Sequence, residues 1–258
     1  LSQAANAKPR LPGDLQNNRK LSAWLRVNAN QTVTLLVGKV ELGQGILTAV
    51  SQVCADELDI DFKRVQVISG DTALVPNEGV TAGSFSMPYC ATAVQYASAE
   101  VRSILLELAA EKLNQPVTSL SVQDGMILGS NGTRIAYWDL VLGESLNREA
   151  TGLVKPKPPH QHRYIGQSVH RIDLTPKILG EAKFVQEHRP TGLLFGHLVR
   201  PPTYAAKLLS ANVASVQKMP GVVKVVRNGS FLGVIAKREE QALAAANALN
   251  ASAKWEVE

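Results

Sequence analysis

The sequence is poor in cysteine, in aromatic residues and in long hydrophobic runs. Its two cysteines, Cys54 and Cys90, exclude a disulfide-rich scaffold and a zinc or iron–sulfur site with four cysteine ligands. No strictly apolar run exceeds Ala242 to Ala246, so no transmembrane helix fits the sequence. Aromatic residues make up 5% of the chain and are not interleaved with basic residues, so the pattern of a base-stacking, nucleic-acid-binding surface is missing.

The rest of the composition is typical of a folded globular protein. Apolar residues make up 45% of the 258 residues and charged residues 19%, which argues against general disorder. The length allows one large domain or two modest ones. The net charge of +5 is spread along the chain without a block of like charges, so we expect no nucleic-acid partner.

Sequence periodicity predicts a strand, a tight turn and a helix in the first half of the chain. Residues 32–40 alternate in polarity, with Val33, Leu35 and Val37 on one face, as in a half-buried strand. From Ile46 the apolar positions follow a helical period. Gly43-Gln44-Gly45 separates the two patterns and predicts the turn between them.

The remaining elements are separated by turn-forming residues. Residues 70–89 are rich in Gly, Pro, Asn and Asp, and a loop this long inside a compact domain indicates a functional segment or a disordered one. A helix with apolar residues from Val94 to Leu108 follows, and Asp124-Gly125 predicts a hairpin. Further strands are predicted at 65–68, 193–199, 222–226 and 231–236, and helices at 213–219 and 239–253. This mixture predicts an α+β fold.

The Gly43-Gln44-Gly45 turn has the layout of an anion site. Glycines let the backbone approach a ligand closely, and unpaired N–H groups at a helix start favour a phosphate. The spacing fits neither the dinucleotide fingerprint, because Thr48 stands where a third glycine is needed, nor the P-loop. The alternative is a strand-to-helix turn without a ligand.

A second small, hydroxyl-rich segment, Thr81-Ala82-Gly83-Ser84-Phe85-Ser86, precedes the second predicted helix. Two such loops, each leading into a helix, could converge on one anionic ligand. If they do, residues 43–86 form a single concave surface. The alternative is a solvated loop whose serines cap the helix.

Other polar residues give no catalytic or metal site. His160 and His162 are two residues apart, without the i, i+4 spacing or third ligand that a helical metal site needs. Glu41, Asp56, Glu57 and Asp59 are interpreted as surface charges that flank a helix. The residues therefore indicate a place to hold a cofactor but no catalytic machinery.

Several motifs in order resemble one family. Val40-Glu41-Leu42-Gly43-Gln44-Gly45-Ile46-Leu47-Thr48, Asp71-Thr72 and the segment 81–86 resemble the molybdopterin-binding subunit of the xanthine dehydrogenase and aldehyde oxidase family, most closely its isoquinoline 1-oxidoreductase and nicotinate dehydrogenase branch. Tyr164-Ile165-Gly166, Arg171-Ile172-Asp173, residues 177–182 and Met219-Pro220-Gly221-Val222 are similar to its α/β hammerhead domain.

The resemblance implies a molybdenum cofactor on a pyranopterin dithiolene, usually the cytosine dinucleotide form in bacteria. The family oxidises aldehydes or hydroxylates electron-poor N-heterocycles, and its electrons pass to a [2Fe-2S] partner and, in this branch, often to a c-type cytochrome. The expected cofactor-binding residues lie in the two loops: Leu42, Gly43, Gln44, Gly45, Thr81, Ala82, Gly83, Ser84, Phe85 and Ser86.

Two features of the family are missing. The chain has no Gly-Gly pair, so the family's Gly-Gly-Phe-Gly-Gly loop is absent, and so is its Gly-Xaa-Gly-Glu catalytic glutamate. Leu142-Gly143-Glu144 and Leu179-Gly180-Glu181 lack the first glycine. We therefore name no catalytic residue or metal ligand and expect an N-terminal part that needs the C-terminal remainder of its subunit. The alternative is a non-catalytic scaffold or ligand-binding protein with this fold.

The resemblance and the composition together predict a domain order and a compartment. The proline-rich segment 155–163 is the expected linker between a partial molybdopterin-binding domain at 21–154 and a hammerhead domain at 164–258, after an extended lead at 1–20. Ala5-Asn6-Ala7 resembles the end of a secretory signal, which together with the habits of the branch predicts a periplasmic protein. A flexible tail is the alternative interpretation of this segment.

Overall fold

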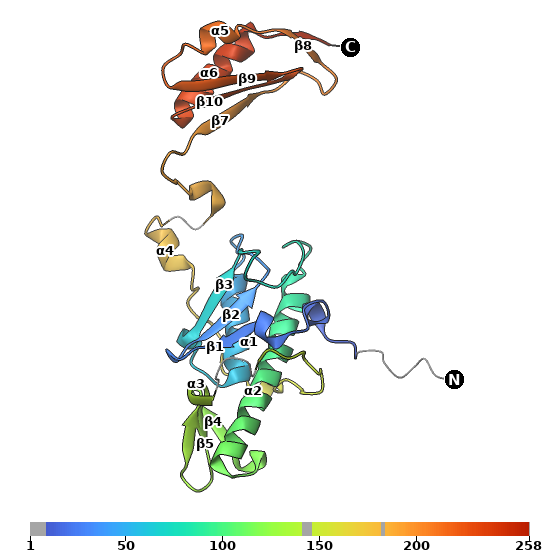
Figure 1. Cartoon of the computed structure of the whole chain (residues 1–258), viewed down its shortest axis with the longest axis vertical. Coiled ribbons are helices and arrows are strands. Elements are labelled where there is room, and N and C mark those ends of the chain that lie inside the picture. Colours follow the sequence, from blue (N-terminus) through green and yellow to red (C-terminus); the bar gives the residue numbers. More distant parts are fainter. Residues whose placement is uncertain (1–8, 141–145, 182–183, 258) are drawn as a thin grey trace, which may run out of the picture. The chain divides into compact units, whose positions relative to one another are not determined.

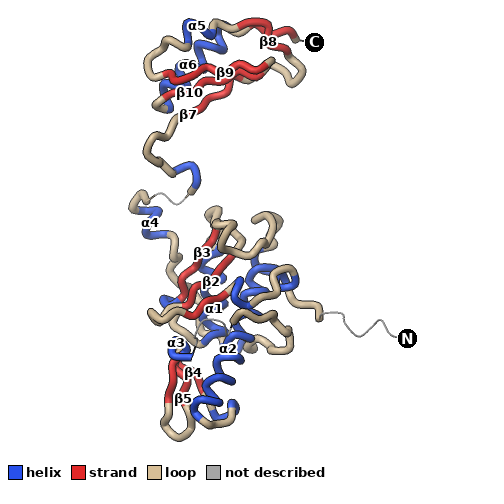
Figure 2. The backbone as a smooth tube through the Cα atoms, viewed as in Figure 1, coloured by secondary structure: helices blue, strands red, loops and turns tan. Residues whose placement is uncertain are grey.

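The computed structural model describes residues 9–140, 146–181 and 184–257, and it divides the chain into two compact units between Glu181 and Ala182 (Figures 1 and 2). Each unit has its own hydrophobic core. Helices and strands occur in both units, which confirms the predicted mixture of α and β structure. No described helix is long and apolar enough to cross a membrane.

The first unit is built on a three-stranded sheet in the order β1-β2-β3. The strands are β1 (Leu25–Val27), β2 (Val33–Val37) and β3 (Val65–Ser69); β1 pairs antiparallel and β3 parallel with β2. The helix α1 (Ile46–Leu58) connects the parallel pair (Figure 1). The strand predicted within 32–40 is confirmed, but all five residues of β2 are buried, so its predicted half-burial is wrong. Because β2 is the central strand, Thr34 and Leu36 on its second face are covered as well.

The two long helices begin and end where the sequence allows. The predicted helix start at Ile46 is confirmed: Gly45 is the N-cap of α1 with φ 83°, a conformation that glycine adopts readily. The helix α2 (Thr92–Leu113) packs against α1 and continues from a π-helical turn at Ser86–Ala91. It ends at Asn114, whose left-handed conformation is typical of a helix C-terminus.

A small antiparallel sheet follows α2. It contains β4 (Ser121–Gln123), β5 (Met126–Leu128) and β6 (Arg134–Ala136), and the short helix α3 (Tyr137–Leu140) comes next. Asp124 and Gly125 both have positive φ, 49° and 76°, as the two central residues of a type I′ hairpin turn require. The predicted hairpin is confirmed.

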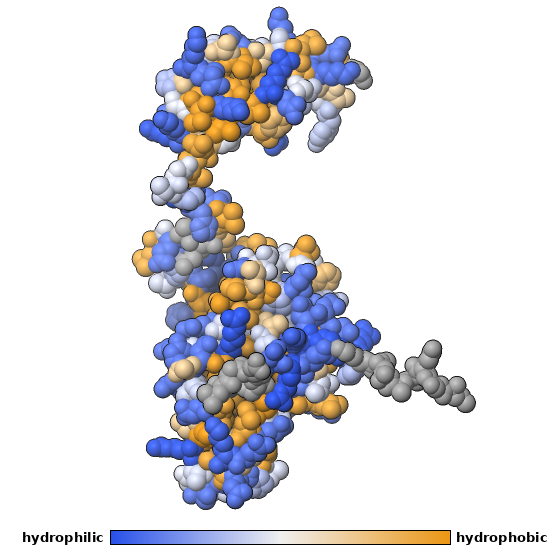
Figure 3. Space-filling view, viewed as in Figure 1, coloured by the Kyte–Doolittle hydropathy of each residue, from blue (hydrophilic) through white to orange (hydrophobic). Residues whose placement is uncertain are grey.

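The second unit contains a three-stranded antiparallel sheet in the order β7-β10-β9, which packs against its longer helix, and a two-stranded sheet β11-β8. Its elements are β7 (Phe195–Val199), β8 (Lys207–Ser210), α5 (Val213–Val216), β9 (Val222–Asn228), β10 (Phe231–Ala236), α6 (Glu239–Ser252) and β11 (Lys254–Glu256). Ala245, Ala246 and Leu249 of α6 share its core. Strand alternation places the exposed side chains of Leu198 and Phe231 on the other face, and apolar side chains are visible on this unit in Figure 3.

The N-terminal lead is not simply extended. Ala5-Asn6-Ala7 and the rest of residues 1–8 lie outside the described residues. Residues Gly13–Gln16 form a 3-10 turn that packs on α2, and the side chains of Leu11 and Leu15 are buried in the first core. The prediction of an extended lead over 1–20 is therefore wrong for its described part, because these two leucines anchor it.

The unit boundary differs from the predicted linker. The segment 155–163 and the motifs at Tyr164 and Arg171 lie within the first unit, which also includes the short helix α4 (Leu174–Ile178). Buried carboxylates of α1 hold this segment: the Lys157 N–H donates to Glu57, at 3.1 Å from Oε2. Burial raises the pKa of Glu57, and the N–H from Lys157 partly offsets that rise.

Asp56 and Glu57 are thus not surface charges, and that interpretation is wrong. Each residue is 1% exposed. The Asp56 carboxylate accepts three consecutive backbone N–H groups, from Arg163 at 2.8 Å, Tyr164 at 3.1 Å and Ile165 at 2.8 Å. Backbone donors from a distant segment compensate the buried charge, which a sequence pattern of side chains cannot reveal.

A polar stripe on α1 extends this attachment along the helix. Thr48, Gln52 and Asp56 are spaced at i, i+4 and i+8, so they share one helix face. The Gln52 amide donates to the carbonyls of Tyr164 at 2.6 Å and Gln167 at 3.0 Å. The Thr48 hydroxyl accepts the N–H of Ile172 at 3.1 Å. The chain after the prolines consequently runs back along α1 toward its N-terminus.

This attachment gives a stability prediction. Asp56→Ala leaves three buried N–H groups without their acceptor, so we expect it to lower the free energy of unfolding by about 2–4 kcal/mol. Asp71→Ala is the matched control, because the exposed Asp71 carboxylate accepts a single local N–H, from Ala73. That control is expected to cost less than about 1 kcal/mol. Chemical denaturation checks both values, and equal costs would contradict the anchoring role of Asp56.

Candidate functional site

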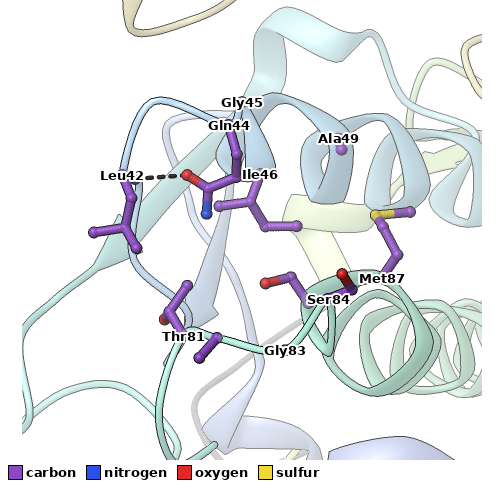
Figure 4. A pocket seen from close by; sticks show the side chains of 11 residues that line it. Leu42, Gln44, Gly45, Ile46, Ala49, Thr81, Gly83, Ser84 and Met87 are labelled. Carbon is purple, nitrogen blue, oxygen red and sulfur yellow. Dashed lines mark hydrogen bonds between the residues drawn. The ribbon is translucent and has the colours of Figure 1, made fainter.

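Both predicted loops line one pocket of about 460 Å³ (Figure 4). The first loop follows the carboxyl end of β2 and the second follows β3, and ligands of parallel strand pairs bind at this edge. The lining residues are Leu42, Gln44, Gly45, Ile46, Ala49, Thr81, Ala82, Gly83, Ser84, Ser86 and Met87. The predicted convergence of the two loops on one concave surface is confirmed.

The match with the ten predicted residues is close but incomplete. Eight of them line the pocket, while Gly43 and Phe85 do not. The Phe85 ring instead packs edge-on against Tyr89, with centroids 5.2 Å apart. A Cβ at Gly43 would meet no atom within 4 Å, so that glycine is required by its φ of 111° rather than by crowding.

Sequence reasoning missed Ile46, Ala49 and Met87, which form an apolar part of the lining. Ile46 and Ala49 lie in the first turn of α1, three residues apart and so on one helix face, and Met87 lies in the first turn after the hydroxyl-rich loop. These three residues could have been found from their position, because residues in the first helical turn after a loop lie at the same edge of the sheet as the loop.

The pocket lining carries no charged side chain. The hydroxyls of Ser84 and Ser86 have no hydrogen-bond partner within the part of the chain that the structure describes. Both residues line the pocket, and Figure 4 shows the Ser84 side chain there. Apolar walls with a few convergent polar groups are typical of small-molecule sites, and the volume lies in their range. The lining suits a small ligand that has both apolar and polar groups.

The serines do not cap the following helix. The N-cap of the π-helical turn is Phe85, and no side chain caps it. Ser84 has φ 60° and follows Gly83 with φ 63°, so the loop turns sharply before the helix. The alternative of a helix cap is therefore wrong for these serines, and their hydroxyls are available to a ligand.

Side chains of the first loop fold back onto its own backbone. Gln44 Oε1 accepts the N–H of Leu42 at 2.6 Å, the dashed line in Figure 4, and Gln44 Nε2 donates to the Val40 carbonyl at 3.0 Å. The N–H groups of Gly43 and Gly45 donate to Glu41, at 2.8 and 2.9 Å from Oε1. The donors predicted to be unpaired are therefore occupied by the chain's own carboxylate.

The second loop is tied to the first. Lys39, 2% exposed, donates its ammonium to the carbonyls of Glu78 and Val80, the latter at 3.0 Å. Thr81 Oγ1 accepts the N–H of Val40 at 3.0 Å. The buried lysine and the threonine thus fix the distance between the two walls of the pocket.

A buried carboxyl supports the same contact. Glu78 accepts the N–H of Gly38 at 2.5 Å through Oε2, and burial raises the pKa of Glu78 to about 7. Asp14 raises this pKa further, while the Cys90 thiol and the Gly38 N–H lower it. Desolvation dominates because the carboxyl is buried in the interior, and the neighbouring Asp14 further disfavours its charged form.

The raised pKa predicts a pH-dependent stability. The folded state binds the Glu78 proton more tightly than the unfolded state, so stability is fully present below about pH 4.5 and is lost as pH rises through 7. We expect the free energy of unfolding to fall by about 2–3 kcal/mol across this range through Glu78. Glu78→Gln mimics the protonated form, so this component should vanish. Denaturation series at several pH values measure how the free energy of unfolding depends on pH. The same dependence in the wild type and in Glu78→Gln would contradict the assignment to Glu78.

No metal site emerges within the described ranges, where no group of three or more His, Cys, Asp or Glu side chains could hold an ion. Both cysteines are free and buried, and burial raises the pKa of Cys54 to about 12. Leu142-Gly143-Glu144 lies outside the described residues. The uncharged residues that line the pocket can hydrogen-bond a ligand. Among these lining residues, no nucleophile lies next to a base.

Comparison with known proteins gives three informative relatives. The nicotinate dehydrogenase of Pseudomonas putida has a subunit that is 35% identical over 245 residues, covering 92% of this chain and 21% of the relative. The beta subunit of isoquinoline 1-oxidoreductase from Brevundimonas diminuta is 26% identical, covering 80% and 31%. The membrane-bound aldehyde dehydrogenase [pyrroloquinoline-quinone] of Gluconacetobacter polyoxogenes is 26% identical, covering 83% and 28%. The chain thus spans less than a third of each relative's length.

The family comparison agrees with the pocket. Residues 4–170 match the family described as the molybdopterin cofactor-binding domain. This range includes both loops and the helices that follow them. The order of motifs, the two loops on one pocket and the match over most of the first unit lead to one conclusion: the chain belongs to the molybdopterin cofactor-binding domain family.

Proposed function

We propose that this chain supplies part of the molybdopterin cradle of a molybdenum hydroxylase. The observation that carries the proposal is that two loops about forty residues apart line the same pocket, in a chain of this family. The side chains that line this pocket are uncharged. The pocket edge at Thr81, Ser84 and Ser86 offers hydroxyls, and Ile46 and Met87 offer an apolar wall. A pterin has a flat ring and polar edges, so these residues fit it.

The roles of the pocket residues follow from their contacts. Ser84 and Ser86 donate or accept at the edge of the ring, because their hydroxyls have no other partner among the described residues. The Thr81 oxygen accepts the Val40 N–H, and its O–H remains able to donate to the ligand. When bound, the cofactor supplies a molybdenum centre for transfer of a water-derived oxygen to substrate.

A serine series tests the cradle. Ser84→Ala and Ser86→Ala each remove one neutral hydrogen bond to the ligand, so cofactor retention should weaken about 2–10-fold, while thermal stability stays within about 0.5 kcal/mol. Ser103→Ala is the control, because Ser103 bonds Glu107 on the exposed face of α2. Molybdenum content after dialysis is the measurement. Retention that is unchanged in the Ser84→Ala, Ser86→Ala double variant would reject the cradle.

The substrate is proposed from the names of the relatives, and the cofactor form and the partners are proposed from the family resemblance of the sequence. Two are named for an N-heterocycle and one for an aldehyde, so the substrate is an aldehyde or an N-heteroaromatic compound. The cofactor is the cytosine dinucleotide form. The C-terminal remainder of the molybdopterin-binding polypeptide supplies the catalytic residues, and a [2Fe-2S] protein together with a c-type cytochrome carries the electrons.

Native mass spectrometry of the complex purified from its source tests this assembly. We expect the mass of a molybdopterin cytosine dinucleotide together with an iron–sulfur chain. A pyrroloquinoline quinone mass, as the third relative's name would suggest, would overturn the cofactor assignment. A complex without any cofactor would favour a scaffold. Residues 1–258 loaded with cofactor should show no turnover, and turnover at an enzymatic rate would overturn the need for the remainder.

We also propose a periplasmic location. Ala5-Asn6-Ala7 resembles a processed signal, and insertion of the cofactor before export requires transport of a folded protein. We expect twin arginines upstream of Leu1 in the precursor. Cell fractionation is the measurement, and a protein found wholly in the cytoplasm would reject the proposal.

A further inference from the structure

The turn that begins α1 contains a filled anion nest. Glu41 Oε1 accepts two N–H groups, from Gly43 at 2.8 Å and from Gly45 at 2.9 Å. Both glycines have positive φ, 111° and 83°, so their N–H groups point to a common acceptor. The Glu41 side chain is 9% exposed, so the carboxylate belongs to the interior of the turn and not to solvent.

A guanidinium from a distant part of the chain closes this nest. Arg171 lies 3.4 Å from Glu41 Oε1 through one terminal nitrogen, and its other terminal nitrogen donates to the Gly43 carbonyl at 2.9 Å. Asp173 accepts from Arg171 at 2.7 Å and also from Lys177. The Arg171 guanidinium, and then Lys177, hold the pKa of Asp173 well below its usual range. Arg171 is thus itself oriented by a permanent negative charge.

The two contacts have a joint consequence for the pocket. The N–H donors of Gly43 and Gly45 are saturated, whereas Leu42, Gln44 and Gly45 line the pocket. The turn therefore offers a ligand its side chains and its backbone shape rather than free donors. The second carboxylate oxygen, Glu41 Oε2, is buried and has no hydrogen-bond partner among the described residues, so Arg171 is the cation that stabilises this charge.

We propose that Glu41 is the resident anion of the Gly43–Gly45 nest and, together with Arg171, the positioning residue that sets the shape of this wall of the pocket. Neither residue lines the pocket, so both act through the turn. The proposal rests on the proposed function only for its effect on the cofactor. The state of the turn itself can be measured without any cofactor.

Amide hydrogen exchange of the peptide 41–46 in the intact protein tests whether Glu41 and Arg171 hold this turn. Glu41→Ala removes the acceptor, so exchange at Gly43 and Gly45 should accelerate about tenfold or more. Glu41→Gln retains a neutral acceptor and should lie between Glu41→Ala and the wild type. Arg171→Gln should also accelerate exchange. Formate should slow exchange again in Glu41→Ala, because a small carboxylate can enter the vacated nest.

Asp61→Ala is the matched control. Asp61 also accepts the N–H two residues on, from Lys63 at 2.8 Å, but lies away from the pocket. It should alter exchange near Lys63 and leave the peptide 41–46 unchanged. Inorganic phosphate is the second probe, and it should not change exchange at 41–46 in the wild type. Phosphate protection there, or unchanged exchange in Glu41→Ala, would overturn the proposal.

Cofactor content of the same variants separates this proposal from the proposed function. Glu41→Ala should lower molybdenum retention, and Glu41→Gln should restore part of it. Faster exchange with unchanged retention would confirm the resident anion but overturn its role in shaping the pocket wall. Lower retention in the serine variants alone would then leave the proposed function standing on the second loop.

Discussion

The Asp56 carboxylate, buried among three backbone N–H groups, determines where the rest of the first unit can go. It fixes residues 163–165 on α1. From there the chain follows the helix, held by Gln52 and Thr48, until Arg171 reaches the turn before α1. One buried charge near the end of the helix thus brings a guanidinium to its beginning, some 130 residues away in sequence from Glu41.

Hydrophobic periodicity and turn-forming residues predict the elements whose formation depends mainly on residues close together in the sequence. The start of α1 at Ile46, the Asp124-Gly125 hairpin and strand β10 at Phe231–Ala236 follow from periodicity and turn chemistry, and the structure has all three. The strand β2 was assigned the wrong exposure because burial of its second face depends on packing. The short strands β8 and β11 pair with each other across more than forty residues, and three or four residues carry too little pattern to reveal this.

The site was predictable for a similar reason. Glycine and hydroxyl residues mark a loop that a ligand can approach, so eight of the ten residues named from the sequence line the pocket. Which acceptor fills the nest of Gly43 and Gly45 could not be predicted, because Glu41 resembles any exposed charge beside a helix. The polar stripe at positions 48, 52 and 56 was the available signal for the attached segment, since a polar residue every four positions opposite an apolar face calls for a polar partner.

The internal bonds of the pocket loops also bear on the thermodynamics of binding. Glu41 orders the first loop, Lys39 and Thr81 join it to the second, and Gln44 bonds its own backbone. Ordering a loop during association costs conformational entropy, which reduces affinity. Here that entropy is already lost when the chain folds. A ligand that binds at this wall should therefore meet a preorganised loop. The binding enthalpy should be close to that of the contacts themselves, with little entropy lost through loop ordering.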